Sequence, residues 1–501
     1  MRRSAARRAA FPGLGAGAPT RRLRCVAVVL VLAACTVGPD YQRPAAELPP
    51  TWTAVEPWQP AHPDDGAPRG AWWRIFADPR LDDLETAAVA RNPSLAVAGE
   101  RLVQARAIAA ATASALWPQV NANAGATRSR NSANRPLANY ALPNSTTLQN
   151  DLVGSFSVRY EADLFGGVHR QVEAARAAAE QSQADLENAR LVLEAEVAAD
   201  YFTLRELDAE IDIVGQNIDQ QRRALDFVRN RHDMGVASGL DLAQAQAQLD
   251  TTATQIDLLR VQRAQTEHAL ATLVGAPAPA FAIVPAAGEL RVPPVPVGVP
   301  SDVLQRRPDV ASAERAMAAA NARIGVARAA YFPSIALGAT VGVESNRLAD
   351  LFRAASSLWS IGLAATQALF EGGRLDANLD FARADYRVAV SGYRETVLTA
   401  MQEVQDGMSG TAYLGRAATE AGAAVRSARR VVDVANDRYA GGLANYLDVI
   451  TAEQALLANQ RQQAQINGQQ MLVTVYLVKA LGGGWAPAGA PLAQAPSTGA
   501  P

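Results

Sequence analysis

The sequence predicts a mainly α-helical protein with a small β part, built as two similar halves. Long Ala- and Gln-rich stretches carry apolar residues at helical spacing, and four shorter segments alternate between apolar and small polar residues. Landmarks of the first half return 206 to 215 residues later: Pro93 and Pro308, Pro118 and Pro333, Gly166 and Gly372, Arg231 and Arg438, Gly235 and Gly442, Asp241 and Asp448. Solenoid units span only roughly 20 to 50 residues, so each half is expected to be a complete structural module.

Composition limits the possible classes of protein. The chain has 501 residues, a formal net charge of -2 and 49% hydrophobic residues, which gives no electrostatic sign of a nucleic-acid partner. Its low aromatic content and many Ala and Gln residues suit long helices whose backbones approach closely. The part after the leader contains no run of 18 apolar residues, so no transmembrane helix is expected.

Residues 1–34 read as a signal peptide. Basic residues precede an apolar stretch from Cys25 to Leu32, which leads into Leu32-Ala33-Ala34-Cys35. This pattern is typical of a lipoprotein cleavage site with Cys35 as the lipidated first residue, although an Ala-rich chain can also produce it by chance. Cys25 would leave with the signal, so the mature chain is expected to have neither a free thiol nor a disulfide. The basic leader is long, so translation is also consistent with a start after Met1.

Residues 35–76 are rich in proline and tryptophan and are expected to form a lipidated, extended N-terminal segment. The first repeat, 77–276, should contain a helix from Leu81 to Leu116 interrupted at Asn92-Pro93, then two strands. Its long helix from Val168 to Met234 reverses at a turn into a return helix from Leu240 to Val274.

A Pro- and Val-rich linker, 277–300, precedes the second repeat, 301–484, which is expected to follow the same order. Its elements are a helix from Asp302 to Ala330, two strands, a long helix from Leu375 to Tyr439 and a last helix ending at Gly482. The tail, 485–501, has a disordered composition.

The four alternating segments favour a membrane barrel. One set of side chains is apolar, as in Ile335, Leu337 and Val341, and the opposite set is small or polar, as in Ser334 and Thr340. Four strands cannot close a barrel, because the smallest have about eight, and an open sheet leaves backbone groups unsatisfied in lipid. The chain must then associate with copies of itself.

Four motifs resemble those of the outer membrane factor family, the TolC-like channels that include NodT/OprM-type lipoproteins: Cys35–Tyr41 (CTVGPDY), Tyr160–Gly166 (YEADLFG), Gln367–Arg374 (QALFEGGR), and Arg438–Gly442 (RYAGG) followed by Tyr446–Asp448 (YLD). The resemblance covers nearly the whole mature chain in order. It implies a homotrimer that shares a twelve-stranded barrel in outer-membrane lipid, continued by a long helical barrel across the periplasm. It also implies a periplasmic adaptor and an inner-membrane pump, usually of the resistance-nodulation-division class.

The turns between the long helices and the return helices are expected to lie at the periplasmic tips. The resemblance implies that these tips meet the adaptor: Gly235, Val236, Ala237 and Ser238 in the first repeat, and Gly441, Gly442, Leu443, Ala444 and Asn445 in the second. Glycine permits a tight reversal with positive φ, which is also a purely structural explanation of these motifs.

Asp433 and Asp437 are spaced i and i+4, hence on one helix face beside the second tip. Three copies would gather six carboxylates around an axis, which predicts a cation-binding periplasmic gate. Asp437 falls where the resemblance places the acidic constriction, whereas a solvated helix face explains the same pair without a gate. In the first repeat Asp226 matches Asp433, but Asn230 replaces the second acid, so the two tips differ.

Enzyme activity is not expected, and neither are catalytic residues, a cofactor or a metal site. The four histidines are scattered, and no nucleophile or phosphate-loop motif appears. The favoured function is the outer-membrane exit channel of a tripartite efflux pump for drugs or other small molecules. The alternatives are a duct for type I secretion or metal efflux, although six Met provide no Met-rich track, and a pore-less periplasmic coiled-coil lipoprotein.

Overall fold

The computed structural model describes residues 37–42, 70–134, 136, 147–286, 288, 290–295 and 306–483. The expected signal peptide, Cys35, most of the Pro- and Trp-rich segment, parts of the linker and the tail lie outside the described residues. The chain divides into two compact units, and each draws segments from both sequence halves. Unit 1 comprises the described parts of Met1–Gln42, Ile108–Arg176 and Ala318–Arg387, and unit 2 the remainder.

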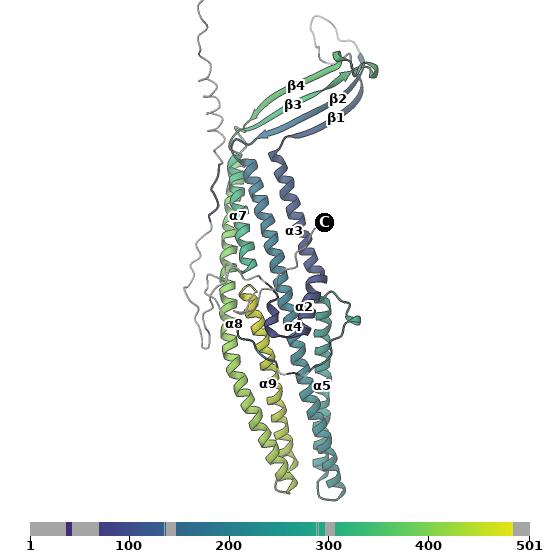
Figure 1. Ribbon diagram of the computed structural model, residues 1–501, viewed down its shortest axis with the longest axis vertical. Coiled ribbons are helices and arrows are strands. Elements are labelled where there is room, and N and C mark those ends of the chain that lie inside the picture. Colours follow the sequence, from purple (N-terminus) through teal and green to yellow (C-terminus); the bar gives the residue numbers. More distant parts are fainter. Residues whose placement is uncertain are drawn as a thin grey trace, which may run out of the picture. The chain divides into compact units, whose positions relative to one another are not determined.

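Unit 1 contains an antiparallel sheet in the order β1-β2-β3-β4 (Figure 1). Its strands are β1 (Gln119–Asn131), β2 (Thr147–Ala162), β3 (Ser334–Ser345) and β4 (Ser357–Thr366). The pairing of β2 with β3, from Leu152 opposite Ser345 to Ala162 opposite Ile335, joins the hairpins of the two halves. Within the described residues, β1 and β4 each pair along one side only, so the sheet is open.

The strand register confirms the expected alternation. One row across the sheet is apolar and consists of Ala122, Phe156, Val341 and Trp359. An adjacent row on the opposite face is polar and consists of Asn121, Ser157, Thr340 and Ser360. The apolar side chains are solvent-exposed in the single chain, with Trp359 76% and Ile361 79% exposed. One face of the sheet therefore presents a band that water does not favour.

The long helices begin and end close to the expected residues. They are α2 (Pro79–Arg91), α3 (Pro93–Ala113), α4 (Gly167–Asp233), α5 (Gly239–Leu273), α7 (Pro308–Ala329), α8 (Arg374–Ala440) and α9 (Tyr446–Ala480). The short 3-10 helices are η1 (Trp72–Phe76), η2 (Ser114–Leu116), η3 (Ala278–Ala280), η4 (Leu348–Asp350) and η5 (Ala354–Ser356). At 67 residues each, α4 and α8 run for about 100 Å.

Prolines explain where two of the helices begin. Asn92 separates α2 from α3, and its side chain accepts a hydrogen bond from Leu95 N (3.0 Å) and donates one to Leu273 O (2.9 Å). Helix α7 begins at Pro308, since the fixed φ of proline suits the first helical position, and Arg306 before it is also helical. Residues 302–305 of the helix expected from Asp302 lie outside the described part.

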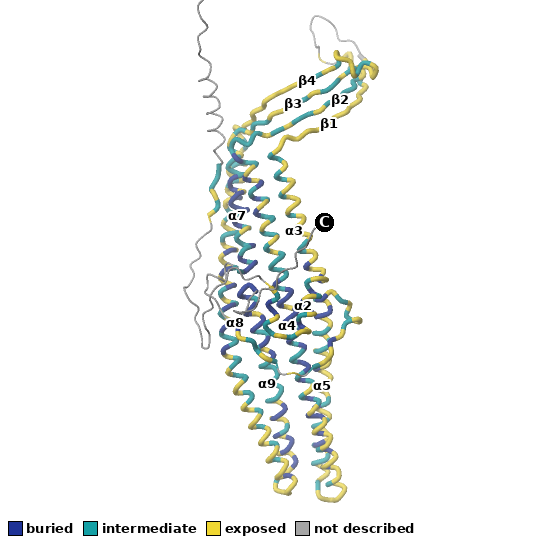
Figure 2. The backbone as a smooth tube through the Cα atoms, viewed as in Figure 1, coloured by how far each residue is buried: buried dark blue, intermediate teal, exposed yellow. Residues whose placement is uncertain are grey.

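The core of unit 2 lies along α4 and α9, where the buried stripe alternates with exposed turns of helix (Figure 2). Tyr201 and Leu204 of α4 and Val475 and Leu477 of α9 are fully buried. The Ala- and Gln-rich helices therefore bury one face each and leave the other face to solvent.

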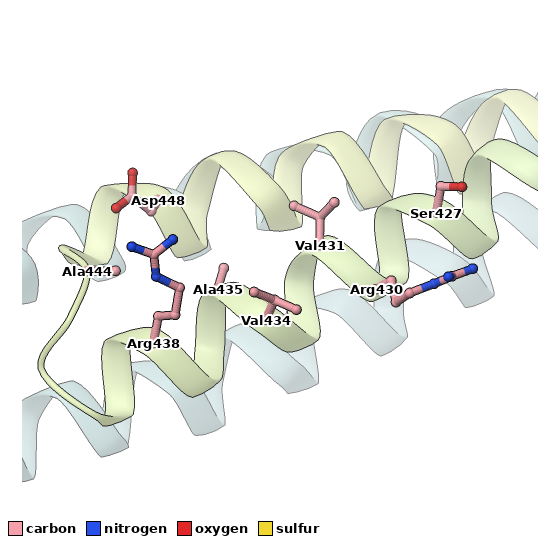
Figure 3. A pocket seen from close by; sticks show the side chains of 8 residues that line it. All are labelled: Ser427, Arg430, Val431, Val434, Ala435, Arg438, Ala444 and Asp448. Carbon is pink, nitrogen blue, oxygen red and sulfur yellow. The ribbon is translucent and has the colours of Figure 1, made fainter.

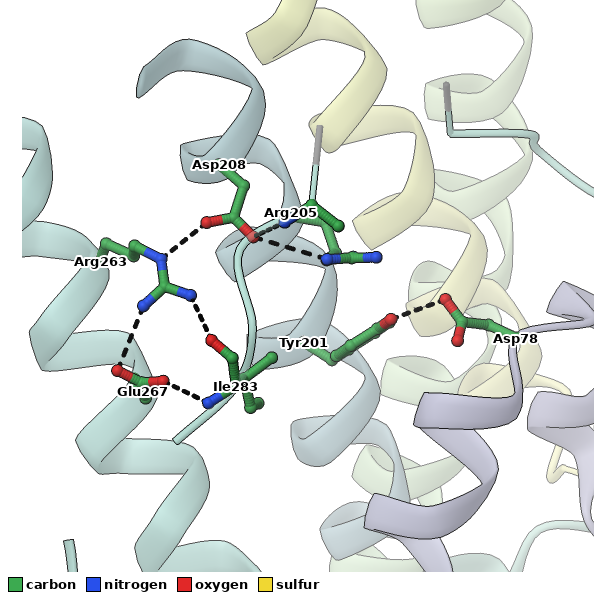
Figure 4. A network of polar contacts seen from close by, with 8 residues as sticks. Asp78, Tyr201, Arg205, Asp208, Arg263, Glu267 and Ile283 are labelled. Carbon is green, nitrogen blue, oxygen red and sulfur yellow. Dashed lines mark hydrogen bonds and ion pairs between the residues drawn. The ribbon is translucent and has the colours of Figure 1, made fainter. Parts of the chain in front are cut away.

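A polar network fixes the segment after α5 against α4 and α5 (Figure 4). Arg263 donates to Asp208 Oδ1 (2.6 Å), Glu267 Oε2 (3.2 Å) and Ile283 O (2.7 Å). Asp208, whose side chain is buried, also accepts from Ala286 N at 3.1 Å. Each charged group in this network has a partner of opposite charge. The described start of the expected linker is therefore held against α4 and α5 by hydrogen bonds.

Candidate gate at the paired helical turns

The two turns between long and return helices, both in unit 2, have the same local geometry. Gly235 (φ +77°) and Gly442 (φ +73°) adopt positive φ after α4 and α8. Val236 N donates to Arg231 O (2.8 Å), and Leu443 N donates to Arg438 O (2.8 Å). These bonds satisfy helix-terminal carbonyls, and each helix ends two residues before its glycine.

The following helices are capped by side chains. Ser238 and Asp241 form a reciprocal capping box at the start of α5. At the start of α9, the Asn445 side chain accepts from Asp448 N at 3.1 Å. Both reversals are therefore held rigidly, and the sequence repeat predicts this equivalence.

Most of the residues expected at the tips are exposed. Gly235, Val236, Ser238, Gly441, Gly442, Leu443 and Asn445 are exposed, whereas Ala237 and Ala444 are half-buried. Val236 and Leu443 occupy equivalent positions of the two repeats, 61% and 74% exposed. The first turn also exposes Met234 (70%), so each turn presents large apolar surface to solvent.

The helix pairs α4–α5 and α8–α9 form two helical hairpins. A single apolar cluster joins them behind their turns: Leu225 and Val228 of α4, Ala245 of α5, Tyr439 of α8, and Tyr446, Val449 and Ile450 of α9. The rings of Tyr439 and Tyr446 lie 5.2 Å apart between centroids. The pKa of the Tyr446 hydroxyl is raised, first by burial and then by the nearby Glu453 carboxylate. The two turns are thus parts of one packed region.

Arg231 makes a contact that the sequence did not reveal. Its Nη1 donates to Ala440 O (3.2 Å), and its guanidinium lies 5.2 Å from the Tyr439 ring and 5.6 Å from the Phe227 ring. A guanidinium within about 6 Å of an aromatic ring is attracted to it. Arg231 therefore links the first hairpin to the end of the second, and its recurrence with Arg438 is the only signal in the sequence.

Arg438 behaves differently from its repeat counterpart. It lines a groove of about 640 Å³ between α8 and α9, where it extends toward Asp448 (Figure 3). The other lining residues are Ser427, Arg430, Val431, Val434, Ala435 and Ala444. The two tips therefore share a backbone conformation but differ in their arginines: Arg231 contacts the other hairpin, whereas Arg438 lines a groove within its own.

Asp433 and Asp437 are both exposed on α8, one turn apart, and take part in no ion pair within the described residues. In contrast, Asp226 of α4 pairs with Arg229 at 3.3 Å. The single chain thus places the two carboxylates on one helix face, as their spacing predicts.

Among the described residues, no group of three or more His, Cys, Asp or Glu could hold a metal ion. His169 contacts Asp163 (2.6 Å) and His232 contacts Ala237 O (3.0 Å), each in isolation. In the same described part, no helix is both long and apolar enough to cross a membrane.

The chain matches the family model of outer membrane efflux proteins over residues 85–276 and 299–483. It is 33% identical over 469 residues to the toluene efflux pump outer membrane protein TtgF of Pseudomonas putida, covering 92% of this chain and 96% of the relative. It is 31% identical over 470 residues to the pyoverdine export outer membrane protein OpmQ of Pseudomonas aeruginosa, covering 93% and 97%.

Solved structures of two channels resemble the fold closely. The outer-membrane channel OprN has a TM-score of 0.83 at 29% identity, covering 90% of this chain and 100% of that one. The open state of the Neisseria gonorrhoeae MtrE channel has a TM-score of 0.79 at 28% identity, covering 90% and 98%. The chain therefore belongs to the outer membrane efflux protein family, and it is a TolC-like exit channel of the outer membrane that extends into the periplasm.

Proposed function

We propose that three copies of this chain form the passive exit duct of a tripartite pump that exports small organic molecules. The open four-stranded sheet carries this proposal. Its apolar row suits lipid and its polar row suits a water-filled lumen. The unpaired edges of β1 and β4 would expose backbone groups in lipid at a cost of several kcal/mol each. Pairing β1 of one copy with β4 of the next removes every edge.

A thiol cross-linking experiment tests the shared barrel. Ser360→Cys on β4, combined in turn with a cysteine at polar-face positions of β1 such as Asn121, Asn123 and Thr127, should yield covalent dimers and trimers with a short bifunctional reagent for one of these pairs. The edge strands would be neighbours between copies, at a register shifted by the stagger that closes a barrel. Asn121→Cys with Ser157→Cys is the matched control, since these residues face each other within one chain. Monomers alone from every β1–β4 pair, with the control pair cross-linked inside one chain, would reject the shared barrel.

Asp433 and Asp437 are proposed to form the cation-binding ring that narrows the periplasmic entrance. The support is their exposure, their common face and their lack of an ion-pair partner within the described residues. Six like charges around an axis repel one another unless cations compensate. We expect D433A with D437A to lose block by divalent cations and to raise single-channel conductance in planar bilayers.

The first tip supplies the control for the gate. Asp226 is the counterpart of Asp433, and its charge is already paired with Arg229, so Asp226→Ala serves as the control. This variant should keep the unsubstituted conductance and cation block. Unchanged conductance and block in D433A with D437A would exclude the gate while leaving the duct intact.

The tips are proposed to contact a periplasmic adaptor, and the pump is proposed to belong to the resistance-nodulation-division class. The exposed apolar side chains of Val236 and Leu443 support a protein contact at each turn. The two relatives named for toluene efflux and pyoverdine export support small organic cargo. Acylation of Cys35 after removal of residues 1–34 is proposed to anchor the chain in outer-membrane lipid.

A further inference from the structure

Two arginines interrupt the apolar face of the sheet, which is the face that carries Ala122 and Trp359. The pairing of β1 with β2 keeps one register along the whole of β1, without a bulge, so alternate residues of β1 share a face. Arg128 and Arg130 therefore lie on the same face as Ala122. They are the only charged residues on that face of the four described strands. The other charged residues of these strands lie on the polar face: Asp151, Arg159, Glu161 and Glu344.

Both arginines lie toward the end of the sheet that is remote from the helices. Helices α3 and α7 precede β1 and β3, and α4 and α8 follow β2 and β4, so the four helices join the antiparallel sheet at one end. Arg128 and Arg130 are at the other end of β1, which connects to β2. The chain extends into the periplasm from its helical end. The arginines are therefore on the side of the outer leaflet of the membrane.

The apolar band of this face ends where the arginines begin. On β1 the alternating side chains are apolar as far as Ala126, and Arg128 comes next. Asn150 of β2 lies opposite Arg128, and at the same end Ser345 and Ser357 are the outermost residues of β3 and β4 on this face. A charged side chain on a lipid-facing strand costs most at the bilayer centre and little at the interface. The arginines therefore mark the level at which acyl chains give way to headgroups.

The protein does not neutralise these two charges itself. Arg128 and Arg130 are exposed, and neither takes part in an ion pair within the described residues. Two positions along one strand place their Cα atoms about 7 Å apart. A guanidinium binds phosphate oxygens through paired N–H donors, and the exposed Asn150 carboxamide adds a neutral donor beside Arg128. This donor set suits a phosphate-bearing headgroup.

We propose that Arg128, Arg130 and Asn150 bind the phosphate groups of the phosphorylated glycolipid that forms the outer leaflet of bacterial outer membranes. Its acyl chains then lie along the apolar side chains that continue from Ala126 toward the helices. Charge complementarity selects this ligand, since at this level of the bilayer a lipid phosphate is an anion that also carries apolar chains. The inference rests on the proposed shared barrel, in which β1 is an edge strand. One site then lies beside each seam between copies.

Native mass spectrometry of the full-length protein tests the site, because it reports bound lipid and oligomeric state together. Delipidated protein in detergent is titrated with diphosphorylated lipid A. R128Q with R130Q should weaken lipid binding about tenfold or more, because the phosphates lose both cationic partners. Each single variant, R128Q or R130Q, should weaken it less. R159Q is the matched control, since it removes an exposed arginine from the polar face of β2 and should leave lipid binding unchanged.

The choice of ligand separates a lipid site from a general anion site. Dephosphorylated lipid A should bind equally weakly to the unsubstituted protein and to R128Q with R130Q. Inorganic phosphate at the same concentration should not displace lipid A, because it makes no contact with the apolar face. Displacement by inorganic phosphate would overturn the lipid as the ligand, and undiminished lipid A binding by R128Q with R130Q would overturn the site.

The oligomeric state distinguishes failure of this site from failure of the shared barrel. Trimers should persist in R128Q with R130Q, which excludes misfolding as the cause of lost lipid. Unsubstituted protein that stays monomeric but loses lipid A in R128Q with R130Q would refute the shared barrel alone. Trimers that bind lipid A equally with and without the two arginines would refute the lipid site alone.

Discussion

Glu85 is a carboxyl group held where water does not reach. Its residue is fully buried on α2, and both carboxyl oxygens have no hydrogen-bond partner among the described residues. Burial, followed by the charges of Glu194 and Asp82, raises the pKa of Glu85 to about 10. Burial also raises the pKa of Glu194 to about 7, although the Trp72 Nε1–H donates to it at 2.9 Å. Glu85 is therefore uncharged in the folded protein at neutral pH.

This pKa shift predicts the sign of a pH effect on stability. Below pH 4.5 Glu85 is protonated in both the folded and the unfolded chain, so it does not make the free energy of unfolding depend on pH. Between 4.5 and about 10 only the folded chain keeps the proton, so stability falls as pH rises, by up to about 1.4 kcal/mol per pH unit. We expect Glu85→Leu to raise the melting temperature more at pH 9 than at pH 5.

Asp83 provides the control for Glu85, because it lies on the same helix and is exposed. Asp83→Leu should change the melting temperature little at either pH. A stabilisation by Glu85→Leu that is equal at pH 5 and pH 9 would contradict the neutral state of Glu85. The sequence shows that Glu85 follows Leu81 by four residues and so shares its face, yet a carboxylate there reads as a solvated residue until the packing is known.

At the scale of elements, the sequence predicts helix ends better than strand ends. Helices α4 and α8 each begin and end within one residue of expectation, since glycines mark their limits. Strand β2 begins at Thr147, five residues before Leu152, where the alternation of apolar and polar residues in the sequence begins. Polar residues at the start of β2 pair with β1 through backbone atoms, which a side-chain pattern does not reveal.

Contacts between distant elements were also beyond the sequence. Arg231 and Ala440 are 209 residues apart, and no local rule connects them. Arg231 and Arg438 occupy equivalent positions of the two repeats. Only the packing of the helices shows that Arg231 contacts the hairpin of the other repeat. The ion pair between Arg170 and Asp40 (2.7 Å) is a similar case, because the motif CTVGPDY indicated a family and not a contact.

Arg231 is expected to restrain separation of the two hairpins. Arg231→Ala removes the two contacts that cross between the hairpins, the hydrogen bond to Ala440 O and the contact with the Tyr439 ring, worth about 1–2 kcal/mol together. We expect a roughly tenfold rise in open probability in single-channel recordings, since 1.4 kcal/mol is tenfold in an equilibrium. Arg229→Ala, which removes only an exposed ion pair with Asp226, should leave open probability unchanged. A lower open probability in Arg231→Ala would show that Arg231 favours the open state.

At the scale of the whole molecule, the family and its fold follow from the sequence because the motifs lie in order along nearly the entire chain. The assembly follows from a physical requirement, since a four-stranded sheet with one apolar face and two free edges is incomplete in lipid. The helices contribute narrow buried faces and exposed Ala- and Gln-rich faces, which suit a wall around water. A closed duct meets both requirements, because it pairs the free edges of the sheet and lets the exposed helix faces line water.

Single-channel recording of the purified protein in planar lipid bilayers tests this account most directly. Trimers should insert and give discrete conductance steps, with larger steps in D433A with D437A. Folded, acylated protein that stays monomeric and gives no conductance steps would contradict the duct.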